Sequence, residues 1–219
     1  MRFDESEPGD DRRRIERALA DIKTYGTARQ RATAELVEQT GINIYLGPAA
    51  KVGGSGSVYI DRLIGVNRAI ARGGLSVRDA AGFVRLNIAR ETIDTGGQQG
   101  IEGTFVHEGK HALDFAQMIS RFSTGDERKF FDPTAYQREY SAHLTAAFYL
   151  MRRGGAYAAE GVGLGILFEA SGNVGVNRKG IRARLKHNYG LTPEQPGRRL
   201  SRLSFPSITP RGRGLWGLL

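Results

Sequence analysis

The sequence contains no cysteine among its 219 residues, and this absence excludes several classes of chemistry. Disulfide frameworks, thiolate nucleophiles, iron–sulfur clusters and cysteine-ligated zinc fingers all need the thiol group. A metal site in this chain must therefore be built from histidine, aspartate and glutamate. Only 4 histidines are available for such a site, so their positions are informative.

Long apolar runs are also missing, and none approaches the ~20 residues that a membrane-spanning helix needs. The best candidate, Gly161–Phe168, is short and is flanked by Glu160 and Glu169. The first residues, Met1–Arg14, lack the apolar core of a secretory signal peptide. We therefore expect neither a membrane span nor a signal peptide. The localisation stays open, and export by a dedicated secretion system or delivery into a target cell is compatible with these features.

Positive charge is in excess, with 32 Lys and Arg against 23 Asp and Glu, which gives a net charge of +9. Such a balance favours contact with nucleic acid, anionic membranes or acidic partners. The excess is spread over short clusters, which typically are solvated faces or tails. Nucleic acid is therefore a partner that the composition allows but does not favour.

The order of hydrophobic and polar residues predicts three segments: a disordered leader over residues 1–10, one domain over 11–190, and a basic tail with proline and glycine over 191–219. Within the domain, helical periodicity and helix-start signals dominate, and short alternating runs predict a few strands. The expected helices cover about 11–40, 102–121, 132–153 and 179–188, the expected strands cover 42–46, 58–60 and 83–89, and 95–103 is expected to be a flexible connector. The predicted fold class is α+β, mainly helical, with a small sheet preceding the central helix.

The residues that carry chemistry lie in the central helix. Residues 107–111 read HEGKH and match the pattern H-E-x-x-H, and their flanks are apolar at helical spacing. Because residues four apart share one helix face, His107 and His111 can reach the same ion. Glu108 points toward the same pocket and can take a proton from a metal-bound water. Two imidazoles at this spacing suit Zn²⁺, which keeps one position open in catalytic sites.

A third protein ligand is needed to complete a catalytic zinc site. The next predicted helix supplies Glu139, and two antiparallel helices could bring it over the histidine pair. His143 lies one turn beyond Glu139 on the same face and competes for the ligand role. We predict that His107, His111 and Glu139 bind the metal and that Glu108 and His143 are catalytic. In this arrangement His143 would hydrogen-bond a ligand or stabilise the oxyanion of a tetrahedral intermediate.

Further polar residues are candidates for supporting roles. Asp114 could accept the second N–H of a ligand histidine, and the alternative is a plain surface carboxylate. Tyr136, Tyr140 and Tyr149 are candidate transition-state donors, although a tyrosine on an amphipathic helix is more often part of the core.

An H-E-x-x-H motif followed by a glutamate on a later helix resembles the gluzincin branch of zinc metallopeptidases, and the resemblance covers about residues 100–150. In that family an aspartate often follows the glutamate by four residues, and His143 takes that place here. The metzincin extension is absent, since Asp114 and Gln117 occupy the positions of its glycine and third histidine. In size and make-up the chain is also similar to the metallopeptidase domains at the C-termini of bacterial polymorphic toxins, including those of Rhs type.

This resemblance implies a zincin-like domain that hydrolyses a protein or peptide substrate through a metal-activated water. It also implies that an extended peptide pairs with a strand upstream of the active helix. Phe83–Ala89 is our first candidate for that strand and Val58–Ile60 our second. A toxin or effector of this kind would have an immunity or inhibitor protein as a further partner.

Two other functions stay open from the sequence. A basic nucleic-acid-binding module would use the arginines and leave the histidine pair incidental or bound to a structural metal. A metal-dependent nuclease is the second, although magnesium sites prefer carboxylates and water to paired imidazoles. The absence of both cysteine and a G-x-S-x-G motif argues against hydrolysis through a covalent nucleophile.

Overall fold

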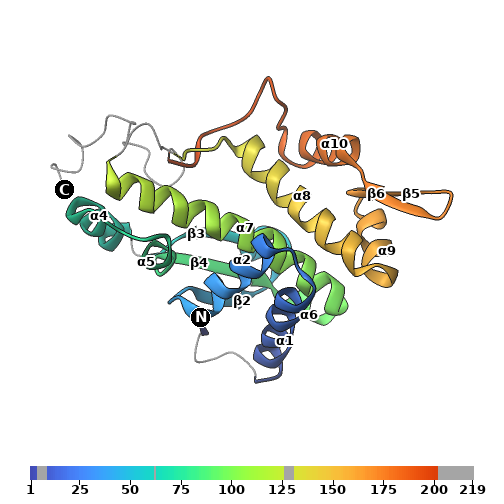
Figure 1. The fold of residues 1–219 in the computed structure, drawn as a ribbon, viewed down its shortest axis with the longest axis horizontal. Coiled ribbons are helices and arrows are strands. Elements are labelled where there is room, and N and C mark those ends of the chain that lie inside the picture. Colours follow the sequence, from blue (N-terminus) through green and yellow to red (C-terminus); the bar gives the residue numbers. More distant parts are fainter. Residues whose placement is uncertain (4–8, 62, 126–130, 202–219) are drawn as a thin grey trace.

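The computed structural model describes residues 1–3, 9–61, 63–125 and 131–201 (Figure 1). These ranges are mainly helical and contain one mixed four-stranded sheet and one two-stranded hairpin. The architecture confirms the predicted α+β, mainly helical fold class. The helices are α1 (Gly9–Tyr25), α2 (Ala28–Gln39), α3 (Ala49–Val52), α4 (Leu63–Arg72), α5 (Val77–Ala81), α6 (Arg90–Asp94), α7 (Gly97–Thr124), α8 (Ala135–Arg153), α9 (Gly155–Gly163) and α10 (Arg178–Tyr189). The strands are β1 (Arg2–Phe3), β2 (Asn43–Gly47), β3 (Gly56–Ile60), β4 (Val84–Ala89), β5 (Leu167–Ala170) and β6 (Asn173–Val176).

The larger sheet has the strand order β1-β2-β4-β3. Strands β1, β2 and β4 run parallel, and β3 pairs antiparallel with β4, from Gly56 opposite Ile88 to Ile60 opposite Val84. Strand β4 is hydrogen-bonded on both sides, so the prediction that Phe83–Ala89 offers a free edge is wrong. The second candidate, Val58–Ile60, lies in β3, which is an edge of this sheet.

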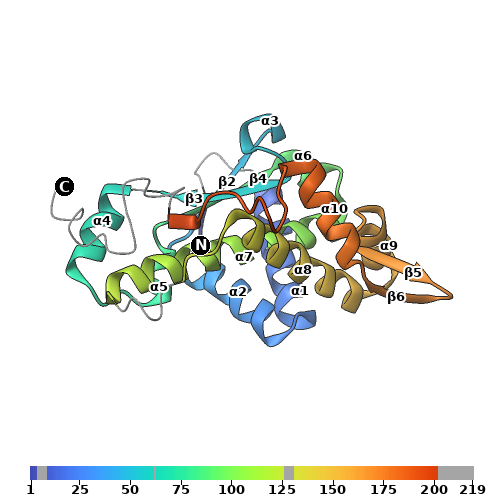
Figure 2. The ribbon, with the colours of Figure 1, turned by 90° about the horizontal axis from the view of Figure 1, so that it is seen from above.

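Helix α7 is the element around which the described chain packs. Figure 2 shows it between the sheet and helices α1 and α2, and it contacts β3, β4, α5 and α8 as well. The prediction of a flexible connector at 95–103 is wrong, because α7 already begins at Gly97. The glycines of this stretch lower its helix propensity, but burial of Ile101 and Glu102 against neighbouring elements compensates for it.

Helix α8 runs back along α7 and begins at Ala135, three residues after the expected start at about residue 132. Its N-cap is Thr134, whose side chain accepts from the amide of Gln137 while the Gln137 side chain accepts from the Thr134 amide. Asp132 is instead engaged by Ser201, whose amide and hydroxyl donate to it at 2.8 and 2.7 Å. A capping box fixes the start of the helix more strongly than a lone cap residue would.

The two ends of the described chain depart from the predicted leader and tail. Arg2 and Phe3 form strand β1, and the N-terminal amine donates to the carbonyls of Glu38 and Thr40 at 2.5 and 2.8 Å. The leader prediction is therefore wrong for residues 1–3 and for residues 9 and 10, which begin α1, and residues 4–8 lie outside the described ranges. In the predicted tail, Leu200 is fully buried in the core, and residues 202–219 lie outside the described ranges.

A buried acidic residue ties α7 to the two helices that follow it. Glu102 is 0% exposed, and the hydroxyls of Tyr149 on α8 and Tyr157 on α9 donate to its carboxylate. Arg153 lies 3.6 Å from the same carboxylate. Tyr149 is thus a structural residue of the core, as tyrosines on amphipathic helices usually are. Because Glu102 precedes the H-E-x-x-H motif on α7, this network holds the motif in place against α8.

We predict that Tyr149→Phe destabilises the protein by about 1–3 kcal/mol, because it removes one donor from a buried carboxylate. Urea denaturation followed by circular dichroism measures this change. Tyr136→Phe is the control, since Tyr136 lies on the same helix and its hydroxyl makes no hydrogen bond within the described ranges. Equal stability of the two variants would show that the Glu102 network contributes nothing to folding.

Candidate metal centre

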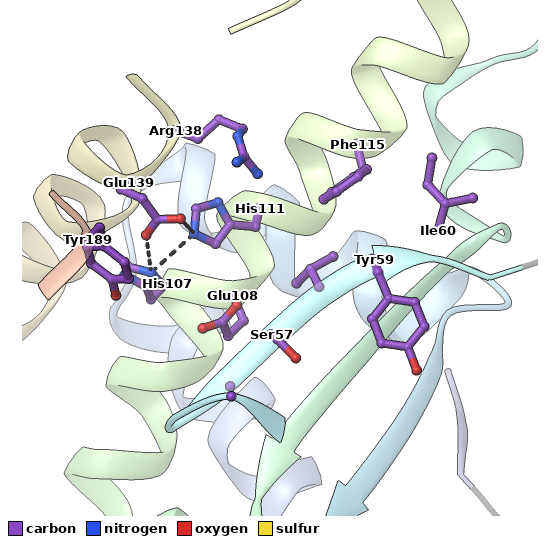
Figure 3. Close-up of a pocket in the computed structure, with 13 residues that line it drawn as sticks. Ser57, Tyr59, Ile60, His107, Glu108, His111, Phe115, Arg138, Glu139 and Tyr189 are labelled. Atoms are coloured by element: carbon purple, nitrogen blue, oxygen red, sulfur yellow. Dashed lines mark hydrogen bonds and ion pairs between the residues drawn. The ribbon is translucent and has the colours of Figure 1, made fainter. Parts of the chain in front are cut away.

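Helix α7 places the histidines of the motif together. His107 and His111 lie one turn apart on the same face, and their Nε2 atoms are 3.2 Å apart (Figure 3). His111 is buried and His107 is half-buried. The opposite face of the motif is packed tightly, because a Cβ on Gly109 would lie 2.9 Å from Thr33 of α2. Packing against α2 therefore fixes α7 on the face opposite the histidines, and the two imidazoles of the motif point to the same side of the helix.

Helix α8 brings Glu139 to these imidazoles. Its Oε2 lies 3.5 Å from Nε2 of His107, and its Oε1 lies 3.3 Å from Nε2 of His111. Two ligands of a tetrahedral zinc ion at ~2.0–2.1 Å from the metal lie about 3.3 Å from each other. Each imidazole thus lies at such a separation from one oxygen of Glu139, His107 from Oε2 and His111 from Oε1.

His143 belongs to the same cluster. It lies one turn after Glu139, and its ring centroid is 4.5 Å from that of His107. The ligand atoms of His107, Glu139 and His143 all lie within 4.8 Å of one another, so this group could hold a metal ion. The described residues therefore offer two ligand sets that share His107 and Glu139. The set with His111 combines two residues of α7 with Glu139, and the set with His143 brings in a second residue of α8.

The donor chemistry of the cluster fits a divalent cation of the zinc type, which takes imidazole nitrogen and carboxylate oxygen. Nε2 of His143 is buried and has no hydrogen-bond partner in the described parts of the chain. A buried polar atom without a partner is costly, and an ion beside it would remove that cost. Nδ1 of His111 is also unpartnered. Neither alternative expected for Asp114, support of a ligand histidine or a plain surface carboxylate, is correct, because Asp114 is buried and pairs with Lys110.

The pKa values of Glu139 and His143 favour the forms that bind a cation. The pKa of His111, in contrast, is raised, because burial is outweighed by its hydrogen bond to Glu139 and by the charges of Glu139 and Glu108. Burial opposes the charge of Glu139, but the hydrogen bonds and charges of His107 and His111 outweigh burial, so the pKa of Glu139 lies below its ordinary value. Burial, together with the charge of His107, lowers the pKa of His143 to about 3. Near neutral pH the cluster therefore offers a carboxylate and an uncharged imidazole, as metal binding requires.

The side chain of Glu108 extends from α7 toward the edge strand β3. Its side chain is buried, and burial raises its pKa above the ordinary value of a glutamate. Gly56 of β3 approaches it so closely that a Cβ at position 56 would lie 2.6 Å from Cγ of Glu108. The absence of a side chain at Gly56 is what allows the strand and this carboxyl group to lie side by side.

Two residues of the site were not found from the sequence. Arg138 and Tyr189 line the same cavity as the histidines (Figure 3). Burial and the charges of Glu139 and Glu108 raise the pKa of Tyr189. The tyrosines that the sequence suggested as transition-state donors make other contacts. The rings of Tyr136 and Tyr140 stack on each other, with their centroids 5.8 Å apart. Tyr189 ends a helix distant in sequence from the motif, and no local pattern marks it.

The cluster lies where two cavities meet. One has a volume of about 450 Å³ and extends along β3 toward Ile60 and Phe115. The other has a volume of about 440 Å³ and extends along α8 toward Ala146 and Leu164. The residues common to both are Gly53, Gly56, His107, Glu108 and Tyr189. A chain-like ligand could therefore extend to either side of the cluster.

Comparison of the chain with protein-family models, with curated proteins and with solved structures gives no match. Among the described helices, none is both long enough and apolar enough to cross a membrane. The interpretation of the site therefore rests on its own geometry.

We predict that Glu139→Ala weakens zinc binding by more than about 100-fold, beyond the range found for groups that only support a ligand. His143→Ala should weaken it by about 10- to 100-fold if His143 supports rather than binds the ion. Equilibrium dialysis with elemental analysis measures both. His187→Ala is the matched control, because His187 is the remaining histidine and is exposed on α10. If the His143 variant loses zinc and the Glu139 variant retains it, His143 is the ligand and Glu139 is the supporting residue.

Proposed function

We propose that this protein is a zinc-dependent peptidase. The observation that carries the proposal is that Nε2 of His107 and Nε2 of His111 lie 3.2 Å apart and that each lies within 3.5 Å of an oxygen of Glu139, with Glu108 beside them. A zinc ion held there would polarise a carbonyl group and lower the pKa of a bound water. His107, His111 and Glu139 are the proposed ligands, with His143 next to them.

Glu108 is the proposed general base. It is buried, it lines both cavities, and its pKa is raised, so it is suited to take up a proton and later return it to a leaving amine. The confined position between α7 and Gly56 limits the directions in which its carboxyl group can turn. His143 and Tyr189 face the same space and are the candidates to donate a hydrogen bond to a developing oxyanion.

Strand β3 is the proposed docking site for the substrate backbone. It pairs with β4 on one side, and residues from Gly56 to Ile60 line the cavity that contains the histidines. An extended peptide could add to such an edge through main-chain hydrogen bonds, which hold a substrate with little dependence on its sequence. This arrangement supports hydrolysis of peptides more directly than hydrolysis of nucleic acid. The toxin or effector role and the immunity partner rest on the sequence resemblance alone and stay predictions.

We expect Glu108→Gln to reduce peptide hydrolysis by at least about 100-fold while zinc stays bound, because the variant keeps the shape of the side chain but cannot accept the proton. Casein and single-stranded DNA, each incubated with the zinc-loaded protein, separate peptidase from nuclease activity. Glu35→Gln is the control, since Glu35 is an exposed carboxylate on α2. Wild-type rates in the Glu108 variant would contradict the base assignment. Cleavage of DNA but not casein would contradict the peptidase proposal.

We also expect Gly56→Ala to reduce hydrolysis by about 100-fold, because the added methyl group displaces the Glu108 carboxyl, and small misplacements of a reacting group cost this much. Gly103→Ala is the control: the new Cβ there would make an ordinary contact of 3.6 Å with Leu150. Rates are compared after thermal melts show that both variants are folded. Unchanged hydrolysis by folded Gly56→Ala would show that the position of Glu108 does not limit the reaction.

A further inference from the structure

Arg138 is a buried cation in the wall of the proposed active site. It precedes Glu139 on α8, is 8% exposed, and lines the 450 Å³ cavity together with His107, His111 and Glu139. Figure 3 shows its side chain reaching from α8 over the cavity toward His111. A guanidinium group keeps its charge at every pH at which proteins fold. Its position therefore adds a fixed positive charge close to the proposed reacting centre.

Arg138 has no ion-pair partner within the described ranges. Its Nε atom is buried without a hydrogen-bond partner. Burial lowers the pKa of Arg138, and the charges of Glu139, Asp114 and Asp132 counter this effect. None of these three carboxylates pairs with Arg138.

Each of the three carboxylates near Arg138 is engaged elsewhere. Glu139 faces the two histidines, Asp114 pairs with Lys110, and Asp132 accepts hydrogen bonds from Ser201. Taking a charge out of water without a partner is costly, and the cost is recovered when an anion binds. The protein thus maintains an unpaired guanidinium where a substrate would pass.

The surroundings of Arg138 indicate which anion fits. Beyond the cluster, the same cavity is lined by the apolar side chains of Val58, Ile60 and Phe115. A group bound there would have an apolar stem and a charged end, as a glutamate side chain or the last residue of a peptide has. The guanidinium group binds carboxylates with two parallel hydrogen bonds, a geometry that a lysine ammonium cannot provide.

We propose that Arg138 binds a carboxylate of the substrate, so that the enzyme selects peptides with an acidic side chain or a free C-terminus close to the cleaved bond. This inference rests on the proposed peptidase function and names its substrate class. Arg138 acts here as a specificity-determining residue. The two sources of the carboxylate, side chain and chain terminus, share the same chemistry and are separated by the test.

The first arm of the test measures hydrolysis by the wild-type protein with zinc. The substrates are a peptide series in which each position near the cleaved bond carries Glu or Gln in turn, and the same peptides with a free or an amidated C-terminus. At one position we expect kcat/KM to be about 10- to 100-fold higher for the peptide that carries the carboxylate than for its uncharged counterpart. This is the range that hydrogen bonds to a charged group provide. This comparison needs no substitution, so it does not depend on a variant that folds.

The second arm measures binding without turnover. Zinc-loaded Glu108→Gln protein is titrated with fluorescent Glu and Gln peptides, alone and combined with Arg138→Gln, Arg138→Lys or Arg152→Gln. Arg152 is the control because it lies exposed on the same helix. We expect Arg138→Gln to abolish the preference for the carboxylate, Arg138→Lys to keep part of it, and Arg152→Gln to keep all of it, with equal zinc content throughout.

The outcomes separate this inference from the proposed function. Hydrolysis of Glu and Gln peptides at equal rates at every position would overturn the inference and leave the peptidase standing. A carboxylate preference in binding that Arg138→Gln leaves intact would also overturn it, because the carboxylate would then be bound by the metal. Selective binding that depends on Arg138, without any hydrolysis by the wild-type protein, would support the carboxylate site and contradict the peptidase proposal.

Discussion

The contact between α7 and α8 is the interaction on which the candidate site depends. Helix α7 alone supplies two imidazoles, and only the packing of α8 against it brings Glu139 to 3.3–3.5 Å from them. The carboxylate of Glu102 fixes this contact from one end, since it accepts hydrogen bonds from Tyr149 on α8 and from Tyr157 on α9. The geometry of the metal cluster is therefore a property of the packed core, not of a flexible loop.

The parts of the site that follow from local sequence were predictable. The spacing of His107 and His111 and the placement of Glu139 on the next helix need only helical periodicity, which is a strong signal in long elements. Arg138 and Tyr189 were missed for a different reason. Their roles come from which cavity they line, and an arginine or a tyrosine on a helix has no local pattern that reveals this.

The errors in the predicted fold have physical causes as well. The alternation in Phe83–Ala89 identified a strand but not its place in the sheet, and five of the six residues in β4 are buried, as expected for a strand with neighbours on both sides. The glycines of 95–103 suggested a connector, but burial of Ile101 and Glu102 outweighs their low helix propensity. In both cases tertiary packing, which the sequence shows only indirectly, decided the outcome.

The division of the ligands between two helices has a thermodynamic consequence. An ion bound by α7 and α8 together would act as a crosslink that exists only in the folded chain, so its binding energy would add to the free energy of unfolding. At a free ion concentration one hundred times the dissociation constant, this linkage amounts to about 2.7 kcal/mol. The availability of the metal in its surroundings would then govern the lifetime of the protein as well as its chemistry.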